Sequence, residues 1–137
     1  MLTAADVMTT DLKTVFETDD LAVAWDLMED GRFRHLPVVD EDGRLVGLLS
    51  HRDLARHALG GVEALPMQEK HAVLAGQEVS SIMVRTPETG EPSEDLTDIA
   101  ERLLENKFGC VPIVEGDRLA GLITESDFVR IFLEQES

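Results

Sequence analysis

The sequence predicts a mixed α/β (α+β) fold, in which two pseudo-symmetric copies of a β-α-β-β-α unit pack as one module. Three observations support this prediction: the chain repeats itself, each copy contains amphipathic helical patterns, and each copy contains two short apolar runs separated by turn residues. The chain has 137 residues, 43% hydrophobic and 29% charged, which is typical of a globular protein. The two copies are expected to share a core, because a unit of about 60 residues is marginal alone.

The internal repeat is visible when the sequence is aligned with itself at an offset of 75 residues, which matches Met8 with Met83. A one-residue deletion in a turn, where VVDEDGRLVG becomes IVEGDRLAG, then changes the offset to 74. We therefore expect a first repeat at 1–59, a linker with a short helix at 60–80, and a second repeat at 81–137. Beyond the turn the aligned pairs are Gly47 with Gly121, Asp53 with Asp127, and Arg56 with Arg130.

Each repeat is predicted to contain an amphipathic helix, a β-hairpin and a second helix. The first helices are expected to begin at N-caps Thr18 and Ser93, and the earlier one to end near Gly31. The runs HLPVVD and LVGLLS, and CVPIVE and LAGLIT in the second copy, have the composition of hairpin strands. The second helices are expected over about 50–59 and 124–133.

A leading segment precedes the first helix of each repeat, with the sequence MTTDLKTV at 8–15 and MVRTPETG at 83–90. Each leading segment is predicted to supply the first strand of its unit. The second segment has Gly90 where the first has Val15, and it also contains Pro87. Because glycine and proline disfavour strand interiors, we expect this strand to be incomplete in the second copy.

Charge and composition exclude several classes of function. The sequence has 28 acidic and 12 basic residues, a formal net charge of −16, whereas nucleic-acid binding requires a basic face. A single cysteine, Cys110, provides neither a disulfide nor a cysteine-based zinc site. The N-terminus lacks signal-peptide features, and no apolar run is long enough to span a membrane. We therefore expect a cytoplasmic protein without nucleic-acid or membrane partners.

Catalytic and metal-binding motifs are not found in the sequence. It contains no P-loop, H-E-x-x-H or G-x-S-x-G, so the protein is predicted not to be an enzyme. Cys110 stands beside a predicted buried strand and is interpreted as a core thiol. His51 and His57 are six residues apart and would face different sides of a helix, so no metal site is predicted.

The repeated pattern resembles a tandem pair of cystathionine-β-synthase (CBS) domains, also called a Bateman module. The motif that carries the resemblance is GLLSHRD at 47–53 and GLITESD at 121–127, each after an LPVV-like strand. Val-Met at 7–8 and Ile-Met at 82–83 precede the two copies, and the resemblance covers about residues 5–132. It implies a regulatory, non-catalytic pair with a ligand cleft between the repeats. No cofactor is required, and the implied ligands are AMP, ADP, ATP, S-adenosylmethionine or related adenosyl compounds.

The resemblance also implies a role for the polar residues of the motif. Asp53 or Asp127 would accept hydrogen bonds from ribose hydroxyls, and Ser50 or Thr124 would lie near the ribose or phosphate. The residues themselves also allow a second interpretation, in which the hydroxyl caps the following helix and the acid lies in its first turn. The two interpretations are compatible, since free N–H groups at a helix N-terminus also attract phosphate.

The two copies differ three residues before the strand proline, where the first has Arg34 and the second has Gly109. In nucleotide-binding relatives a basic residue here meets phosphate, which implies that the first copy is better equipped for a phosphorylated ligand. The alternatives are that Arg34 is a solvated loop residue, that His35 is structural, and that leading-segment contacts are only surface loop. The full predicted ligand-binding set is Lys13, Arg34, His35, Ser50, Arg52, Asp53, Arg85, Thr86, Thr124, Ser126 and Asp127.

The function predicted from the sequence is a regulatory module that binds an adenosine-containing ligand between its repeats. The resemblance is to a stand-alone pair, so a homodimer and a separate effector protein are expected as partners. Ligand binding would shift the orientation of repeats or chains through different affinities for two arrangements. The alternative is a ligand-free structural module whose dimer face binds another protein. Stabilisation by an adenosyl ligand would distinguish these two functions.

Overall fold

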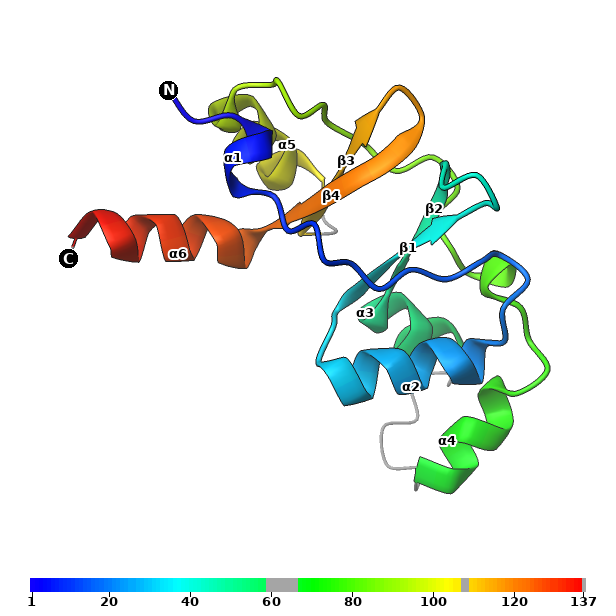
Figure 1. The fold of residues 1–137 in the computed structure, drawn as a ribbon. Helices are drawn as coiled ribbons and strands as arrows, with labels where there is room; N and C mark the ends of the chain where they lie inside the picture. Colours follow the sequence, from blue (N-terminus) through cyan, green and yellow to red (C-terminus); the bar gives the residue numbers. More distant parts are fainter. Residues whose placement is uncertain (59–66, 107–108, 137) are drawn as a thin grey trace. The chain divides into compact units, whose positions relative to one another are not determined.

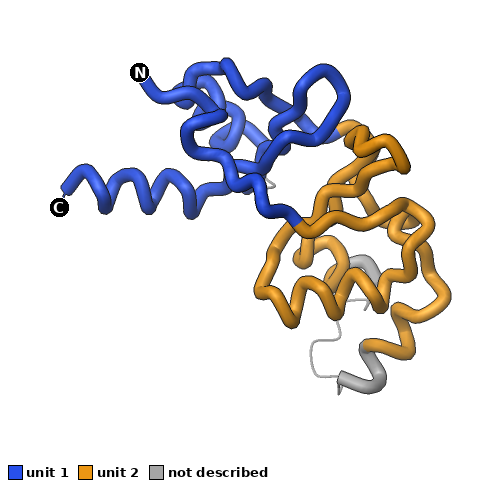
Figure 2. The backbone as a smooth tube through the Cα atoms, viewed as in Figure 1, with its two compact units in different colours: residues 1–12, 87–137 blue, residues 13–86 orange. Residues whose placement is uncertain are grey.

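A computed structural model describes residues 1–58, 67–106 and 109–136 of the chain (Figure 1). They form two compact units, which Figure 2 shows in different colours. The central unit consists of residues 13–86, and the terminal unit consists of residues 1–12 and 87–137. Each unit contains a two-stranded antiparallel sheet and its own cluster of buried apolar side chains. The predicted mixed α/β fold with two similar halves is confirmed.

The central unit is built around a hairpin of β1 (His35–Val39) and β2 (Leu45–Ser50). The helix α2 (Leu21–Gly31) precedes the hairpin, and its apolar face enters the core of the unit. A single turn, α3 (His51–Asp53), follows β2 and continues as a π-helix, η1 (Leu54–Ala58). The predicted short helix of the linker is present as α4 (Met67–Leu74), and a 3₁₀ turn, η2 (Val79–Ser81), follows it.

The terminal unit has the same order of helix, hairpin and helix, but one long helix, α6 (Glu125–Glu136), follows its hairpin where the central unit has α3 and η1. It begins with a short helix, α1 (Ala4–Val7), and resumes with α5 (Leu96–Glu105). The hairpin consists of β3 (Cys110–Glu115) and β4 (Arg118–Thr124). The last helix, α6, begins where predicted and is longer than expected.

The predicted N-caps Thr18 and Ser93 are wrong. The α2 helix is capped by Asp20, whose Oδ1 accepts a hydrogen bond from the backbone N–H of Ala22 at 2.8 Å. The cap of α5 is Asp95, whose carboxylate accepts from the N–H of Thr97 at 2.9 Å. Several cap-forming residues are adjacent in both sequences, and an aspartate at the last of these positions reaches the free N–H groups of the first turn. The α2 helix ends at Gly31, as predicted.

The first leading segment pairs with both units along its length. Thr9 forms two backbone hydrogen bonds with Leu122 of β4, at 2.9 and 3.0 Å. A few residues later, Val15 forms a parallel bridge with Val38 of β1. The expected first strand is therefore a single bridge in the central unit.

The second leading segment follows the same path in the opposite direction. Val84 exchanges two backbone hydrogen bonds with Leu48 of β2, both at 2.9 Å, and Gly90 then forms a parallel bridge with Ile113 of β3. Gly90 thus pairs as Val15 does, so the expected difference between the two strands is not found. Because each segment changes unit midway, the compact units and the sequence repeats divide the chain differently.

The glycine that opens each motif leaves space for the leading segment that runs against the hairpin at that point. A Cβ atom at Gly47 would lie 2.7 Å from Met83 Sδ and 3.0 Å from the backbone oxygen of Val84. In the terminal unit, a Cβ atom at Gly121 would lie 2.7 Å from Met8 Sδ. The close approach of a leading segment to the hairpin explains why both motifs begin with a residue that lacks a side chain.

Candidate functional site

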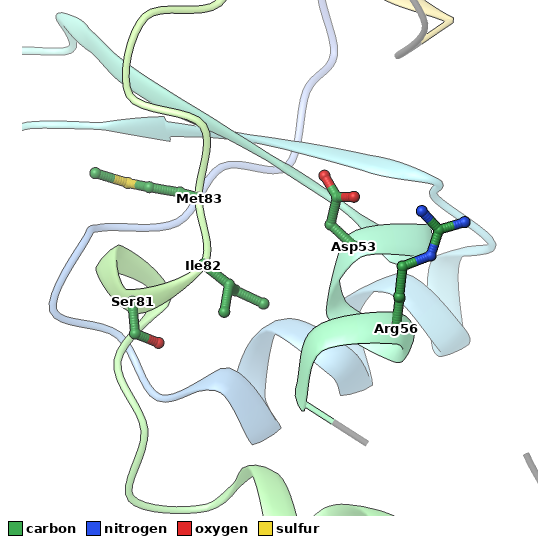
Figure 3. Close-up of a pocket in the computed structure, with 5 residues that line it drawn as sticks. All are labelled: Asp53, Arg56, Ser81, Ile82 and Met83. Carbon is green, nitrogen blue, oxygen red and sulfur yellow. The ribbon is translucent and has the colours of Figure 1, made fainter. Parts of the chain in front are cut away.

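A pocket of about 500 Å³ lies within the central unit. This volume is in the range of pockets that hold small molecules, about 300–1,000 Å³. One wall comes from the end of the first repeat's motif and the turn after it, and the other comes from the chain just before and at the start of the second leading segment (Figure 3). The lining residues are Asp53, Arg56, Ser81, Ile82 and Met83.

Asp53 presents its carboxylate to this pocket. Its backbone N–H donates to Ser50 Oγ at 3.0 Å, which confirms Ser50 as the cap of the following turn. Ser50 itself is buried, and Asp53 is half-buried. Among the residues whose side chains the structure describes, the Asp53 carboxylate has no hydrogen-bond or ion-pair partner. It is therefore free to accept hydrogen bonds from a ligand.

Arg56 lies beside Asp53 on the same wall, and Ile82 extends toward both from the facing segment (Figure 3). Arg56 belongs to the π-helix η1 and is exposed. Within the described part of the chain, its guanidinium forms no ion pair, including with Asp53. The pocket thus offers a carboxylate, a cation and an apolar surface.

In the terminal unit, the equivalent aspartate and arginine, Asp127 and Arg130, are hydrogen-bonded to each other. Asp127 is only 3% exposed, and its Oδ2 accepts a hydrogen bond from the backbone N–H of Thr124 at 2.8 Å. Its Oδ1 accepts a hydrogen bond from Arg130 Nη2. The hydroxyl of Thr124 lies 2.8 Å from that of Ser126. Both oxygens of the second motif's carboxylate are therefore used within the protein.

Cys110 lies close to this second carboxylate. The side chain is 1% exposed, and burial raises the pKa of its thiol to about 12, with a smaller contribution from the negative charge of Asp127. Because a thiol with this pKa stays protonated at neutral pH, Cys110 is the core thiol that the sequence predicted.

The other predicted ligand residues do not line the pocket of Figure 3. Arg34 is exposed, and its backbone oxygen accepts a hydrogen bond from the N–H of His51 at 2.8 Å. His35 is half-buried at the start of β1. The remaining residues outside the terminal unit's motif are exposed: Lys13, Arg52, Arg85 and Thr86.

Sequence reasoning missed four of the five lining residues. Arg56 could have been found, because the repeat aligns it with Arg130 at the same spacing from the motif aspartate. Ile82 and Met83 were aligned only as markers of the second repeat. Their position in the pocket depends on the crossing of the second leading segment, which repeat alignment does not reveal.

His51, one of the two histidines considered for metal binding, has a structural position. Its ring stacks on Trp25 with centroids 4.7 Å apart, and its Nε2 lies 3.0 Å from Glu29 Oε1. These contacts hold α3 against α2. The side chain of His57 lies outside the described residues. No cluster of three or more His, Cys, Asp or Glu residues suited to a metal occurs in the described part of the chain.

None of the helices in the described ranges combines the length and the apolar character needed to cross a membrane.

Comparison with known families identifies the fold. The sequence profile of the CBS domain matches the chain twice, at residues 4–60 and 79–134. The chain belongs to the CBS domain family. The two matches correspond to the two repeats, and the polar motif that lines the pocket lies at the end of the first.

Solved CBS pairs have the same fold over nearly the whole chain. The crystal structure of CBSX2 in complex with AMP matches with a TM-score of 0.83 at 30% identity, covering 100% of both chains. The CBS domain pair of protein MJ0100, in complex with 5′-methylthioadenosine and S-adenosyl-L-methionine, matches with a TM-score of 0.82 at 25% identity, covering 98% of both.

Curated relatives include longer proteins. The CBS domain-containing protein CBSX1 of Arabidopsis thaliana, described as chloroplastic, is 32% identical over 142 residues, covering 90% of this chain and 60% of CBSX1. A homoserine O-acetyltransferase of Methanococcoides burtonii is 30% identical over 128 residues, covering 93% of this chain and 23% of the enzyme. The chain therefore spans less than two thirds of these relatives.

Proposed function

We propose that this CBS pair is a regulatory module whose central unit binds an adenosine-containing ligand. The observation that carries the proposal is the half-buried Asp53 carboxylate, which faces the pocket without a partner among the described residues. A carboxylate can accept hydrogen bonds from both hydroxyls of a ribose. The proposed ligands are AMP, ADP, ATP and S-adenosylmethionine.

The rest of the pocket wall suits the other parts of such a ligand. Ile82 and Met83 provide apolar surface for an adenine ring, and Ser81 provides a hydroxyl nearby. The complexes of CBSX2 with AMP and of MJ0100 with 5′-methylthioadenosine and S-adenosyl-L-methionine support an adenosyl ligand. The predicted contacts outside the pocket are retained as outer contacts in this proposal, namely the exposed Lys13, Arg34, Arg52, Arg85 and Thr86 and the half-buried His35.

Binding at the second motif would require a rearrangement. Asp127 would have to give up the hydrogen bond from Arg130 before it could accept one from a ribose. Thr124 and Ser126 would follow, because their hydroxyls are within hydrogen-bond distance of each other. We therefore propose the central unit as the first site to be occupied.

The proposed role is regulatory and not catalytic. The pocket wall at 81–83 continues along the chain into the terminal unit, which begins again at residue 87. Ligand binding would favour one arrangement of this segment, and an effector protein would respond to the change. A cytoplasmic location is part of the proposal.

We also propose that the module is a homodimer formed through α6. Three large apolar side chains are exposed on this helix: Val129 at 58%, Phe132 at 60% and Leu133 at 60%. A two-fold dimer would cover each copy's apolar face with the same face of the other copy. Light scattering should give a dimer for the wild type and a monomer for Phe132→Glu, whereas Val23→Glu on α2 should leave the mass unchanged.

A binding measurement tests the adenosyl ligand. Thermal shift and calorimetry with AMP, ADP, ATP and S-adenosylmethionine should detect binding of at least one ligand, which stabilises the folded state by mass action. Asp53→Asn should abolish the shift, and Asp30→Asn, an exposed acid in the same unit, should leave it unchanged. If no adenosyl compound binds to the folded wild type, the function becomes that of a ligand-free interaction module.

A further inference from the structure

Arg56 differs from its counterpart in the second repeat, although the two arginines have the same spacing from the motif aspartate. Arg130 donates to Asp127, so its charge is compensated within the protein. Arg56 lines the pocket together with Asp53, and no described residue forms an ion pair with either of them. As far as the described residues go, the central unit therefore presents to the pocket a cation that has no ion-pair partner.

The helix geometry explains the difference. Arg130 follows Asp127 by three residues in a regular α-helix, where side chains at this spacing are neighbours. Arg56 lies in a π-helix of Leu54–Ala58, whose turn contains more residues than an α-turn. Two side chains three residues apart are therefore rotated further from each other. Single π-turns within helices occur frequently at functional sites.

We infer that Arg56 selects ligands with an anionic 5′ substituent, so that the central unit binds a nucleoside 5′-phosphate more tightly than the unphosphorylated nucleoside. The inference rests on the proposed adenosyl site and assigns its specificity. Figure 3 shows the side chains of Arg56 and Asp53 apart on the same wall of the pocket, so one ligand can meet the guanidinium with its phosphate and the carboxylate with its ribose hydroxyls. A guanidinium forms paired hydrogen bonds with phosphate oxygens.

The net charge of −16 does not prevent this selection. Charges beyond the Debye length of about 8–10 Å are screened at ordinary salt concentrations. A guanidinium in direct contact with the phosphate is screened much less, so the local cation decides the preference. The overall charge lowers the rate of association more than the affinity.

Calorimetry with AMP and adenosine tests the inference on four proteins: wild type, Arg56→Gln, Arg56→Lys and Arg130→Gln. The wild type should bind AMP more tightly than adenosine. Arg56→Gln should weaken AMP binding on the order of 10- to 100-fold, the range of a hydrogen bond to a charged group, and leave adenosine binding unchanged. Arg56→Lys should retain part of the preference, because the charge remains without the paired geometry.

Arg130→Gln is the matched control and should leave the affinities of the central unit for both compounds unchanged, with any binding at the released Asp127 seen as a second site in the calorimetric stoichiometry. The inference is overturned if Arg56→Gln weakens AMP and adenosine equally, because that result describes a structural role, or if it weakens neither. It is also overturned, with the proposed function intact, if the wild type binds adenosine as tightly as AMP. Binding of neither compound by the folded wild type overturns the proposed function and this inference together.

Discussion

The two units use the same aspartate–arginine spacing in opposite ways. In the terminal unit, Asp127 is buried, bonded to a backbone N–H and paired with Arg130. In the central unit, Asp53 and Arg56 both face a pocket, and no partner for either is found among the described residues. The motif therefore does not by itself identify a ligand site. The helix that follows decides whether the carboxylate is hydrogen-bonded within the fold or faces a pocket.

The units also differ in the contacts made by the helix that precedes each hairpin, α2 in the central unit and α5 in the terminal unit. In the terminal unit, Arg102 of α5 forms a two-pronged ion pair with Glu94, with Nη1–Oε1 at 2.9 Å and Nη2–Oε2 at 2.5 Å. The repeat alignment places Leu27 at the position of Arg102, and Leu27 packs against the core of the central unit. An ion pair on α5 in the terminal unit thus corresponds to an apolar packing contact on α2 in the central unit.

The largest expected effect comes from the glycines that both units share. Gly47→Ala and Gly121→Ala should each reduce the free energy of unfolding by about 3 kcal/mol, the upper range for overpacking. The added methyl would meet a methionine sulfur at 2.7 Å and a backbone oxygen at 3.0 Å or 2.9 Å, so a flexible side chain cannot relieve the whole clash. Urea denaturation measures the loss.

Ligand binding separates the two glycine variants. Gly47→Ala displaces Met83, which lines the pocket, so it should also weaken AMP binding. Gly121→Ala acts on Met8 in the terminal unit and should leave the affinity of the folded protein unchanged. Equal effects of both variants on affinity would contradict the assignment of the pocket to the central unit.

The second expected effect tests the two carboxylates. Asp127→Ala should lower the free energy of unfolding by about 2 kcal/mol, because it removes a buried carboxylate and leaves the part-buried N–H of Thr124 without its acceptor. Asp53→Ala should cost less than about 0.5 kcal/mol, since no described partner is lost. Denaturation curves of the two variants should therefore differ, whereas AMP binding should be lost only in Asp53→Ala. Equal stability losses would show that the two aspartates have the same role.

A smaller effect is expected from the ion pair of the terminal unit. The hydrogen bonds from Arg102 hold the pKa of Glu94 below its ordinary value of 4.5. A lowered folded-state pKa stabilises the fold above the unfolded pKa, and this stabilisation is lost as the pH falls through the folded value. Arg102→Leu, which copies Leu27, should cost about 1 kcal/mol at pH 7.

The cost of Arg102→Leu should become smaller in acid but not vanish, because Arg102 also donates a hydrogen bond to the backbone oxygen of Thr89 at 3.1 Å. Urea denaturation at pH 7 and near pH 3 should show a smaller acid-induced loss of stability in the variant than in the wild type. The matching change in the central unit, Leu27→Ala, removes apolar packing and should cost the same at both pH values. A pH-independent cost of Arg102→Leu would mean that the pair with Glu94 does not contribute.

The sequence predicts local structure well where one residue type decides it. The repeat, both hairpins, the linker helix and the Ser50 cap follow from turn residues, apolar periodicity and capping chemistry. The N-cap of α2 could not be ranked, because Thr18, Asp19 and Asp20 can all cap a helix. Asp20 also accepts a hydrogen bond from the N–H of Gly76, a contact distant in sequence.

The candidate site could be predicted only in part. The resemblance of the motif to CBS domains indicated both Asp53 and Asp127, and the sequence did not show that only Asp53 lines the pocket. The repeat alignment could have indicated Arg56, but its separation from Asp53 and the position of Met83 required the fold, because a π-turn and a single long-range bridge between Leu48 and Val84 leave no pattern in the sequence. Local chemistry therefore indicated one wall of the pocket, and tertiary pairing supplied the other.

The smallest expected effect concerns Arg34, the cation that the sequence indicated first. Arg34 is exposed and does not line the pocket, so a contact with a ligand phosphate would be screened by solvent. Arg34→Gln should weaken AMP binding about threefold, which corresponds to roughly 0.6 kcal/mol. This loss should shrink more at 0.5 M salt than the loss in Arg56→Gln, because Arg56, although exposed in the free protein, lines the pocket and would contact the phosphate directly. A larger loss in Arg34→Gln than in Arg56→Gln would show that the ligand's anion lies on the β1 side of Asp53, and the comparison of the two motif arginines would then no longer explain specificity.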